Sequence, residues 1–429
     1  MPDACPDRAA LLAARLAATR ARSVTLTDGL SAEDMVVQSM PDASPVKWHL
    51  AHTTWFFETF VLGPHAGQPP HDPAWAYLFN SYYVAAGDRH PRPRRGLVTR
   101  PGVAEVLDWR AQVDRRLAAF LESGPAAEAL DLIDLGIAHE QQHQELLLTD
   151  LKHLLAQNPL RYLLRPAGPG TDDRVPGGLP PLGWVEHPGG LVEVGHAGPG
   201  FAYDNEGPRH RVWLEPFALA DRPVTCGEWL AFMADGGYAT PSLWLSDGWA
   251  AVQAEGWRAP LYWRDAGDGD WRVFTLSGER RPDPAEPVAH VSQYEADAFA
   301  RWAAGVHAGS SSPAGLGTRL PTEAEWETVA ALRAPSGTFA DAGRYHPAPL
   351  SGPSWYGEVW DWTASAYLPY PGFRTAAGAV GEYNGKFMSG QMVLRGGSCA
   401  TPTGHVRPTY RNFFPPAARW QFSGLRLAR

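Results

Sequence analysis

The stretch HEQQHQE at residues 139–145 lies inside a run with helical apolar periodicity that extends from Leu132 to Leu155. Residues four apart lie on one face of an α-helix, so His139 and His143 can direct two imidazoles at one point. Glu145 follows two residues later and adds a carboxylate to the same segment. The stretch therefore predicts a helix that carries metal ligands.

The same letters match H-E-x-x-H, the zinc-peptidase pattern, in which Glu140 would be the general base. Metzincins place a third His six residues after the second, but Thr149 occupies that position, and the next His, His153, has no glycine turn before it. Glu140 also lies about 100° around the helix from His139, so we expect it to point away from an ion that His139 and His143 share. A zinc hydrolase is therefore a distant alternative.

A second helical pattern, at residues 46–62, follows the start signal Ser44-Pro45 and carries His49 and His52. Helical bundles build metal sites from inward side chains on facing helices, so either histidine could supply a third ligand. The alternative is that these histidines are hydrogen-bonded core or surface residues. The residues alone leave this choice open.

The composition limits the class of protein. A chain of 429 residues is long enough for two or three domains. The net charge of −9 argues against a nucleic-acid partner or an anionic membrane. No apolar run is long enough to span a membrane, no signal-peptide segment opens the chain, and Cys5, Cys226 and Cys399 are isolated. We therefore expect a cytoplasmic protein without nucleic-acid or membrane partners.

The two halves of the chain have different patterns. The first half predicts a four-helix bundle with one long connection, and the second predicts short strands and turns rich in Trp, Gly and Pro. The expected organisation is α+β, with a helical bundle at residues 1–164, a linker at 165–182 and an α+β domain at 183–429. Helices are expected at residues 8–20, 31–37, 46–62, 103–123 and 127–158 and, in the second half, at 225–235, 293–304 and 322–333; residues 305–317 are expected to be a surface insertion.

Five segments of the second half form a recognisable set: GGLVEVG at 189–195, DNEGPRHRV at 204–212, RLPTEAEWE at 319–327, GEVWDWT at 357–363 and LRGGSC at 394–399. These segments resemble the formylglycine-generating and sulfatase-modifying fold, a C-type-lectin-like α+β fold. The first half, with its H-x3-H-x-E motif, resembles a DinB-type helical bundle. Their fusion is the architecture of the ergothioneine-biosynthesis sulfoxide synthases, a family that includes a selenoneine synthase branch.

The resemblance implies a non-haem iron enzyme. Its implied Fe(II) ligands are His52, His139 and His143, with Glu145 supporting them and His49 off the metal. The family reaction uses O2 to join a thiol sulfur to the imidazole C2 of hercynine (Nα-trimethylhistidine), giving a sulfoxide. The expected partners are thus hercynine and a thiol or selenosugar donor.

The resemblance also assigns residues to the substrates. Gln142 and Asn412 would contact hercynine, and Phe413, with Phe414 beside it, would line its pocket. A quaternary ammonium cannot donate a hydrogen bond, so aromatic faces suit it. The α+β domain would complete this pocket beside the helical bundle.

Tyr82 and Tyr83 match an active-site tyrosine pair of one family branch, where a phenol can supply a proton. Loop packing is the alternative for both residues. The arginines of the segment HPRPRR at 90–95, Arg92 and Arg94 in particular, would hold an anionic group of the donor, although they could equally form a solvated basic loop.

The identity of the donor is left open by departures from the family pattern. Phe414 stands where some relatives place an acidic residue for γ-glutamylcysteine. Ala289, Gln293, Ser389 and Gly390 differ in size or polarity from the residues expected there. These differences are either drift or a different donor, so selenoneine synthesis from 1-seleno-β-D-glucose is the alternative to a sulfur donor. Cys226 and Cys399 are not in the context of the catalytic cysteine pair of formylglycine-generating enzymes.

Overall fold

The computed structural model describes residues 8–161, 163–164, 181–307, 317–376, 381 and 384–429. Its contacts divide the chain into two compact units, Met1–Pro159 with Thr375–Tyr383, and Leu160–Arg374 with Asn384–Arg429. The linker expected at 165–182 and the insertion expected at 305–317 fall largely outside the described residues.

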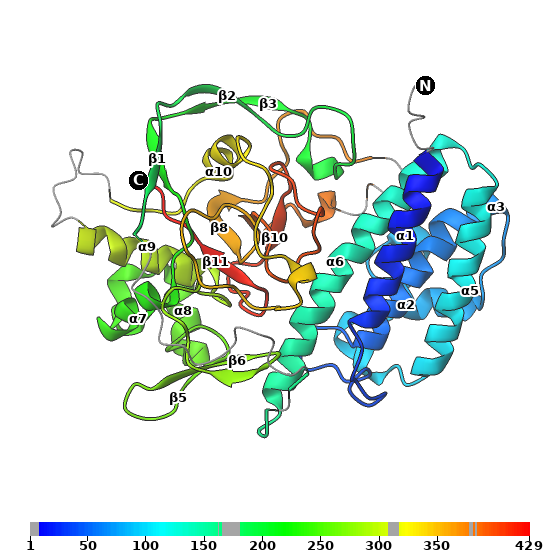
Figure 1. Ribbon diagram of the computed structural model, residues 1–429, viewed down its shortest axis with the longest axis horizontal. Coiled ribbons are helices and arrows are strands. Elements are labelled where there is room, and N and C mark those ends of the chain that lie inside the picture. The colour runs from blue at the N-terminus through cyan, green and yellow to red at the C-terminus, as the bar shows by residue number, and fades with distance from the viewer. Residues whose placement is uncertain (1–7, 162, 165–180, 308–316, 377–380, 382–383) are drawn as a thin grey trace. The chain divides into compact units, whose positions relative to one another are not determined.

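The first unit is built on four long helices that run alongside one another (Figure 1). Helices α1 and α2 each contact both α5 and α6, which closes the bundle. The sequence prediction of a helical bundle is therefore confirmed. The helices are α1 (Arg8–Thr25), α2 (Val46–Phe57), α5 (Val103–Glu122) and α6 (Ala127–Gln157), and the shorter elements are α3 (Gly63–Ala66), α4 (Pro73–Phe79), a π-helix (Glu58–Leu62) and 3-10 helices at Val84–Ala86 and Arg92–Leu97.

Helix α2 is buried on every side, because all twelve of its residues lie in the interior. A helix with this burial is the centre of its bundle rather than part of a surface. Its polar residues must therefore find hydrogen-bond partners inside the protein. This requirement determines how the histidines of α2 are held.

Helices α2 and α6 approach closely at Gly136. A Cβ atom at this position would lie 2.4 Å from Cε1 of Phe57, whose side chain is fully buried. The glycine therefore allows the end of α2 to pack against α6 one turn before His139. This contact sets the distance between the two helices that carry the predicted ligands.

Three predicted helices of this unit differ from the structure. The helix expected at residues 8–20 continues to Thr25. Residues 32–36 form turns instead of the helix expected at 31–37, although the side chains of Ser31 and Asp34 each accept a hydrogen bond from the other residue's backbone N–H. The helix expected at 46–62 changes to a π-helix at Glu58. Pro64 explains this change, since proline lacks an N–H and its ring conflicts with the carbonyl four residues earlier.

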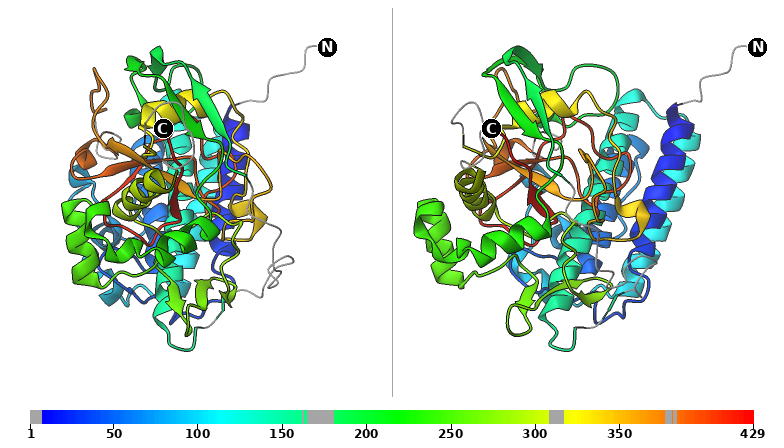
Figure 2. Two further views of the ribbon diagram at one scale, coloured as in Figure 1. Left: turned by 90° about the vertical axis from the view of Figure 1, so that its left-hand side faces the viewer. Right: turned by 60° about the vertical axis from the view of Figure 1, so that its left-hand side comes forward.

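The second unit contains a mixed sheet with the strand order β10-β9-β8-β11. Within it, β8 pairs with β9 and β9 with β10 in antiparallel fashion, while β11 runs parallel to β8. The other strands of the described residues form two two-stranded ribbons, β1 with β4 and β2 with β3, and the three-stranded sheet β5-β6-β7 (Figure 2). The strands are β1 (Trp184–His187), β2 (Gly190–Val194), β3 (His210–Leu214), β4 (Phe217–Ala220), β5 (Trp263–Asp265), β6 (Trp271–Thr275), β7 (Gly278–Arg280), β8 (Trp360–Ala366), β9 (Met392–Arg395), β10 (Asn412–Phe414) and β11 (Ser423–Leu425).

Among the described residues of this unit, four α-helices accompany the strands, and three of them match predicted positions. The missed helix is α8, a ten-residue element in which only Gly248 and Val252 are buried, so it carries little apolar periodicity. None of the helices in the described residues is both long and apolar enough to cross a membrane. The helices are α7 (Cys226–Ala234), α8 (Ser246–Glu255), α9 (Gln293–His307) and α10 (Glu323–Ala330).

Buried arginine–carboxylate pairs hold the mixed sheet to α10. Arg395 of β9 is fully buried and pairs with Glu323 at 2.9 Å and Glu327 at 3.1 Å. Arg411, directly before β10, bonds Glu323 through Nε at 2.9 Å. These pairs fix the start of β10, which carries the predicted substrate residue Asn412.

We expect the substitution Gly136→Ala to destabilise the helical unit by about 1–2 kcal/mol. The overpacking cost against Phe57, about 1–3 kcal/mol, exceeds the gain in helix propensity, at most ~1 kcal/mol. Urea unfolding followed by far-ultraviolet circular dichroism measures this change. Gly305→Ala is the matched control, because an added Cβ at this helical glycine of α9 meets open space. Equal stabilisation by both substitutions would refute the close-contact role of Gly136.

Candidate metal centre

Three histidines from α2 and α6 converge in the helical unit. One ligand atom from each of His52, His139 and His143 lies within 4.8 Å of the others. The Nε2 atoms of His52 and His139 are 3.1 Å apart. His52 and His139 are buried, and His143 is partly exposed. The structure thus brings together the three residues that the sequence resemblance selected.

These imidazoles are in the neutral form that binds metal ions. Burial lowers the pKa of His139 to about 3. Burial and the neighbouring imidazoles lower the pKa of His52 and His143 well below the usual value for histidine. A neutral imidazole keeps one nitrogen lone pair free for a metal ion.

The environment of His52 shows which nitrogen carries that lone pair. Its Nδ1 lies 2.6 Å from the carbonyl oxygen of Phe79, which can only accept a hydrogen bond. Nδ1 therefore carries the proton, and Nε2 presents its lone pair toward His139. Trp48 stacks on the His52 ring, with the ring centres 4.6 Å apart, and restricts its rotation.

The group formed by His52, His139 and His143 fits a transition-metal ion. Two nitrogens about 2.1 Å from one ion and about 90° apart lie roughly 3.0 Å from each other, close to the observed separation of His52 and His139. Imidazole nitrogen suits zinc, copper, nickel and iron alike, so these ligands do not by themselves select one metal. Three protein ligands also leave coordination positions for other molecules.

His49 does not belong to this group of ligands, but it contacts it. Its Nδ1 lies 2.8 Å from Nδ1 of His143, and its Nε2 lies 3.1 Å from Oδ2 of Asp150. The same Oδ2 accepts a hydrogen bond from the backbone N–H of Ser44 at 2.8 Å. Sequence reasoning missed Asp150, although a residue seven after His143 lies on the same helix face.

Glu140 faces away from the three histidines and is fully buried. Its carboxylate pairs with Arg110 and, at 3.1 Å, with Arg20, and accepts a hydrogen bond from Ser23 at 2.6 Å. Burial alone would raise the pKa of Glu140, but the two arginines and Ser23 hold it at about 2. The carboxylate therefore stabilises the bundle and is not positioned as the base that a zinc peptidase needs.

The two predicted tyrosines have different environments. Tyr83 is buried and packs against Phe60 at 5.0 Å and Trp55 at 5.7 Å. Trp55 also stacks on His52, so it lies between Tyr83 and the histidine group and contacts both. Tyr82 stacks on Tyr83 at 4.7 Å and is partly exposed.

The arginine segment lies on the 3-10 helix Arg92–Leu97. Arg92 and Arg94 are exposed, and Arg92 donates to the backbone carbonyl of Asp42. Arg95 is buried, and its guanidinium lies 3.4 Å from the ring centre of Trp48, the residue that stacks on His52. The sequence did not distinguish this buried cation from its exposed neighbours.

Gln142 and Glu145 are partly buried on α6. Gln144, which lies between them in the sequence, is buried and donates to the carbonyl of Thr19 at 2.8 Å. The side chains of this helix thus divide between the face toward α1 and the face that carries His139 and His143.

In the second unit, β10 presents the predicted hercynine residues on alternate faces. Successive strand residues point to opposite sides, so Asn412 and Phe414 share one face and Phe413 points to the other. Phe413 stacks on Tyr367 at 4.1 Å, which gives it a packing role. The side-chain oxygen of Asn412 accepts from the N–H of Phe413 at 2.9 Å. Its amide nitrogen remains the donor for another group.

The four residues that depart from the family pattern are not equivalent. Ala289 is buried and lines a cavity of about 10 Å³ with Cys226 and His290, which is room for no more than about one water molecule. Gln293 is also buried. Ser389 and Gly390 are exposed. The small cavity gives no support to Ala289 as a determinant of donor choice.

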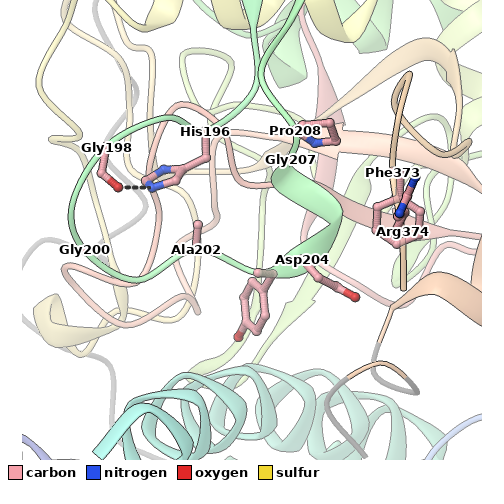
Figure 3. A pocket seen from close by; sticks show the side chains of 10 residues that line it. His196, Gly198, Gly200, Ala202, Asp204, Gly207, Pro208, Phe373 and Arg374 are labelled. Atoms are coloured by element: carbon pink, nitrogen blue, oxygen red, sulfur yellow. Dashed lines mark hydrogen bonds between the residues drawn. The ribbon is translucent and has the colours of Figure 1, made fainter. Parts of the chain in front are cut away.

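A larger hollow of about 430 Å³ lies at the surface of the second unit (Figure 3). Asp204 lines it and accepts a hydrogen bond from Asn384 at 2.9 Å. His196 bonds the carbonyl of Gly198 at 3.2 Å on the opposite side. None of the site residues predicted from the sequence lines this hollow.

Comparisons with known proteins agree with the two units. Residues 15–147 match the DinB superfamily, and residues 181–348 and 334–429 match the sulfatase-modifying factor enzyme 1-like domain. The hercynine oxygenases of Mycobacterium tuberculosis and Mycolicibacterium smegmatis are each 34% identical to this chain, over 97% of it and 98% of their own length. The hercynine oxygenase of Mycolicibacterium thermoresistibile is 32% identical over 99% of this chain and 96% of its own length.

This chain belongs to the ergothioneine-biosynthesis sulfoxide synthase family. The family resemblance stated from the sequence is therefore confirmed. The predicted α+β fold class is also confirmed: a DinB-like bundle is followed by a domain that resembles that of the formylglycine-generating enzymes.

We expect Glu140→Gln to destabilise the helical unit by about 3 kcal/mol at pH 7, because it leaves Arg110 and Arg20 buried beside a neutral amide. The lowered pKa of Glu140 means that its contribution is present above about pH 4.5 and is lost as the pH falls toward 2. The difference in unfolding free energy between wild type and variant should therefore shrink over this range in urea titrations.

Glu122→Gln is the matched control at an exposed position of the same unit, and its effect should stay within about 0.5 kcal/mol. A Glu140→Gln protein of unchanged stability that binds metal but has lost all activity would instead identify Glu140 as a catalytic base.

Proposed function

We propose that this protein is an iron(II)- and O2-dependent oxygenase that joins sulfur or selenium to the imidazole C2 of hercynine. The observation that carries the proposal is the convergence of three neutral histidines, His52, His139 and His143, on α2 and α6. The named activity of the relatives supports hercynine as the substrate.

The proposed reaction balances with one O2. Hercynine loses the hydrogen on C2, the thiol loses its hydrogen, and a C–S bond forms, which is a two-electron oxidation. Oxygenation of sulfur to the sulfoxide removes two more electrons. O2 accepts all four, with one oxygen atom in the sulfoxide and the other in water. Bound iron(II) would supply the reactivity toward O2 that amino-acid side chains lack.

We assign hercynine recognition to Gln142 of the helical unit and Asn412 of the second unit. The amide nitrogen of Asn412 is a donor suited to the hercynine carboxylate. Phe414 shares the face of β10 with Asn412, so it is better placed than Phe413 to offer an aromatic surface to the trimethylammonium group.

Tyr82 and Tyr83 remain the proposed proton donors. Of the two, Tyr82 is the stronger candidate, because it is partly exposed whereas Tyr83 packs in the core. A phenol that delivers a proton at the right step would favour coupling over plain oxidation of the thiol.

The donor would be held by the arginine segment. Arg92 and Arg94 are exposed cations, and Arg95 is a buried cation whose bonding partners, Ser44 and Ser81, are neutral hydroxyls. Asp150 acts on Arg95 electrostatically, and an anionic group of the donor would add to this compensation of its charge. Phe414 in place of an acidic residue argues against a γ-glutamylcysteine amine, so a different thiol and a selenosugar both remain candidates.

We expect the iron-loaded protein to convert hercynine and one donor into a coupled product. Protein is incubated anaerobically with iron(II) and hercynine, and O2 is then added with cysteine, γ-glutamylcysteine, glutathione or 1-seleno-β-D-glucose in parallel. Mass spectrometry should find the summed masses of hercynine and donor, plus one oxygen atom and minus two hydrogen atoms. The donor that reacts decides between sulfur and selenium.

His143→Ala should lose both bound iron and product, whereas the control His71→Ala, at an exposed histidine of the same unit, should keep both. Iron-loaded wild-type protein that forms no coupled product with any of the four donors would contradict the proposed function.

We expect Asn412→Leu to raise the KM for hercynine about tenfold or more, the effect of losing about 1.4 kcal/mol of hydrogen bonding. Iron affinity should not change, because Asn412 is not a metal ligand. Steady-state kinetics and iron titration measure the two quantities. An unchanged KM would exclude Asn412 from the hercynine site.

A further inference from the structure

A chain of three side chains leads from Asp150 to one of the metal-binding histidines. Oδ2 of Asp150 lies 3.1 Å from Nε2 of His49, and Nδ1 of His49 lies 2.8 Å from Nδ1 of His143. Asp150 and His49 are both buried, so water does not replace these bonds. These hydrogen bonds run from Asp150 on α6 to His49 on α2 and from there to His143 on α6.

The direction of each hydrogen bond follows from the chemistry of the groups. An ionised carboxylate only accepts hydrogen bonds, so Nε2 of His49 must carry a proton. A neutral imidazole has one N–H, so Nδ1 of His49 is the acceptor for His143. Nδ1 of His143 therefore donates, and the lone pair of His143 is placed on Nε2.

The other possible assignment conflicts with metal binding. A charged His49 would donate through both nitrogens and would make Nδ1 of His143 an acceptor. The proton of neutral His143 would then be on Nε2 and would block that atom as a ligand. Metal binding through Nε2 thus requires the assignment in which Asp150 accepts and His143 donates.

We propose that Asp150 and His49 are positioning residues that fix the tautomer and the ring orientation of His143 and so raise the affinity of the metal site. The inference rests on the proposed function, because it presupposes a metal ion bound by His143. It extends that function to residues that touch neither the metal nor a substrate. Asp150 is itself fixed by the N–H of Ser44, which precedes α2.

His52 is oriented by a different group with the same result. The carbonyl of Phe79 accepts from its Nδ1 and leaves Nε2 free. A carbonyl in the backbone cannot be removed by substitution, whereas the Asp150–His49 pair can. This pair is therefore the accessible test of whether hydrogen bonding to the distal nitrogen controls metal affinity. Hydrogen-bond partners of metal-bound histidines typically contribute about 10- to 100-fold in metal affinity.

The test is metal titration of His49→Phe and Asp150→Ala, with cobalt(II) as a spectroscopic probe and iron(II) in competition with a chelator. Each variant should bind both metals about tenfold or more weakly than wild type. His71→Phe, the same substitution at an exposed histidine, should bind normally. Nitrogen-15 spectra of histidine-labelled metal-free protein should show His143 protonated on Nδ1 in wild type and a loss of this preference in both variants.

Thermal unfolding of the metal-free variants separates weakened binding from loss of fold, and His49→Phe retains a ring of similar size if Asp150→Ala unfolds. Metal affinities within twofold of wild type in a folded variant would overturn the proposed role. Failure of wild-type protein to bind either metal would refute the metal site itself, and with it any role for Asp150 and His49 in supporting a ligand.

Discussion

The burial of α2 on all sides is the constraint on which the site depends. A buried histidine without a hydrogen-bond partner is costly, so the two histidines of α2 are stabilised by partners within the protein. His52 forms a hydrogen bond with the carbonyl of Phe79, and His49 forms hydrogen bonds with Asp150 and His143. The bonds that satisfy the interior of the bundle are thus the bonds that orient the imidazoles.

Burial has different effects on the protonation of the side chains on the two sides of α6. On one side, Glu140 remains ionised because Arg20 and Arg110 surround it. On the other, burial lowers the pKa of His139 and His143 far enough that both imidazoles stay neutral. A neutral and correctly oriented imidazole is the form that a metal ion needs, so the apolar surroundings prepare the site.

Periodicity and motif spacing were sufficient to predict the bundle and the helix on which His139 and His143 share one face. They could not show Gly136 as a helix contact, because that role depends on Phe57, 79 positions earlier in the sequence. They also could not separate Arg95 from Arg92 and Arg94, since burial of one residue in a 3-10 helix depends on its contact with Trp48.

Other sequence signals were present but were not used. The spacing of seven residues between His143 and Asp150 is two helical turns, which places both on one face. The alternation along β10 likewise predicts that Asn412 and Phe413 point to opposite sides. In both cases the sequence contained the local geometry. The roles of Asp150 and Phe413 depend on residues distant in the sequence: Asp150 bonds His49, and Phe413 stacks on Tyr367.

The role of the H-E-x-x-H residues depends on the helices that pack around them. His139 and His143 face α2, while Glu140 and Gln144, also four residues apart, face α1, where they bond Ser23 and Thr19. The motif therefore spans two adjacent faces of α6, one packed against α2 and the other against α1. In a zinc peptidase the glutamate must reach the water on the metal, which requires an open cleft beside the helix. Here α1 and α5 fill that side with arginines, so the same letters encode a bundle contact instead of a hydrolytic base.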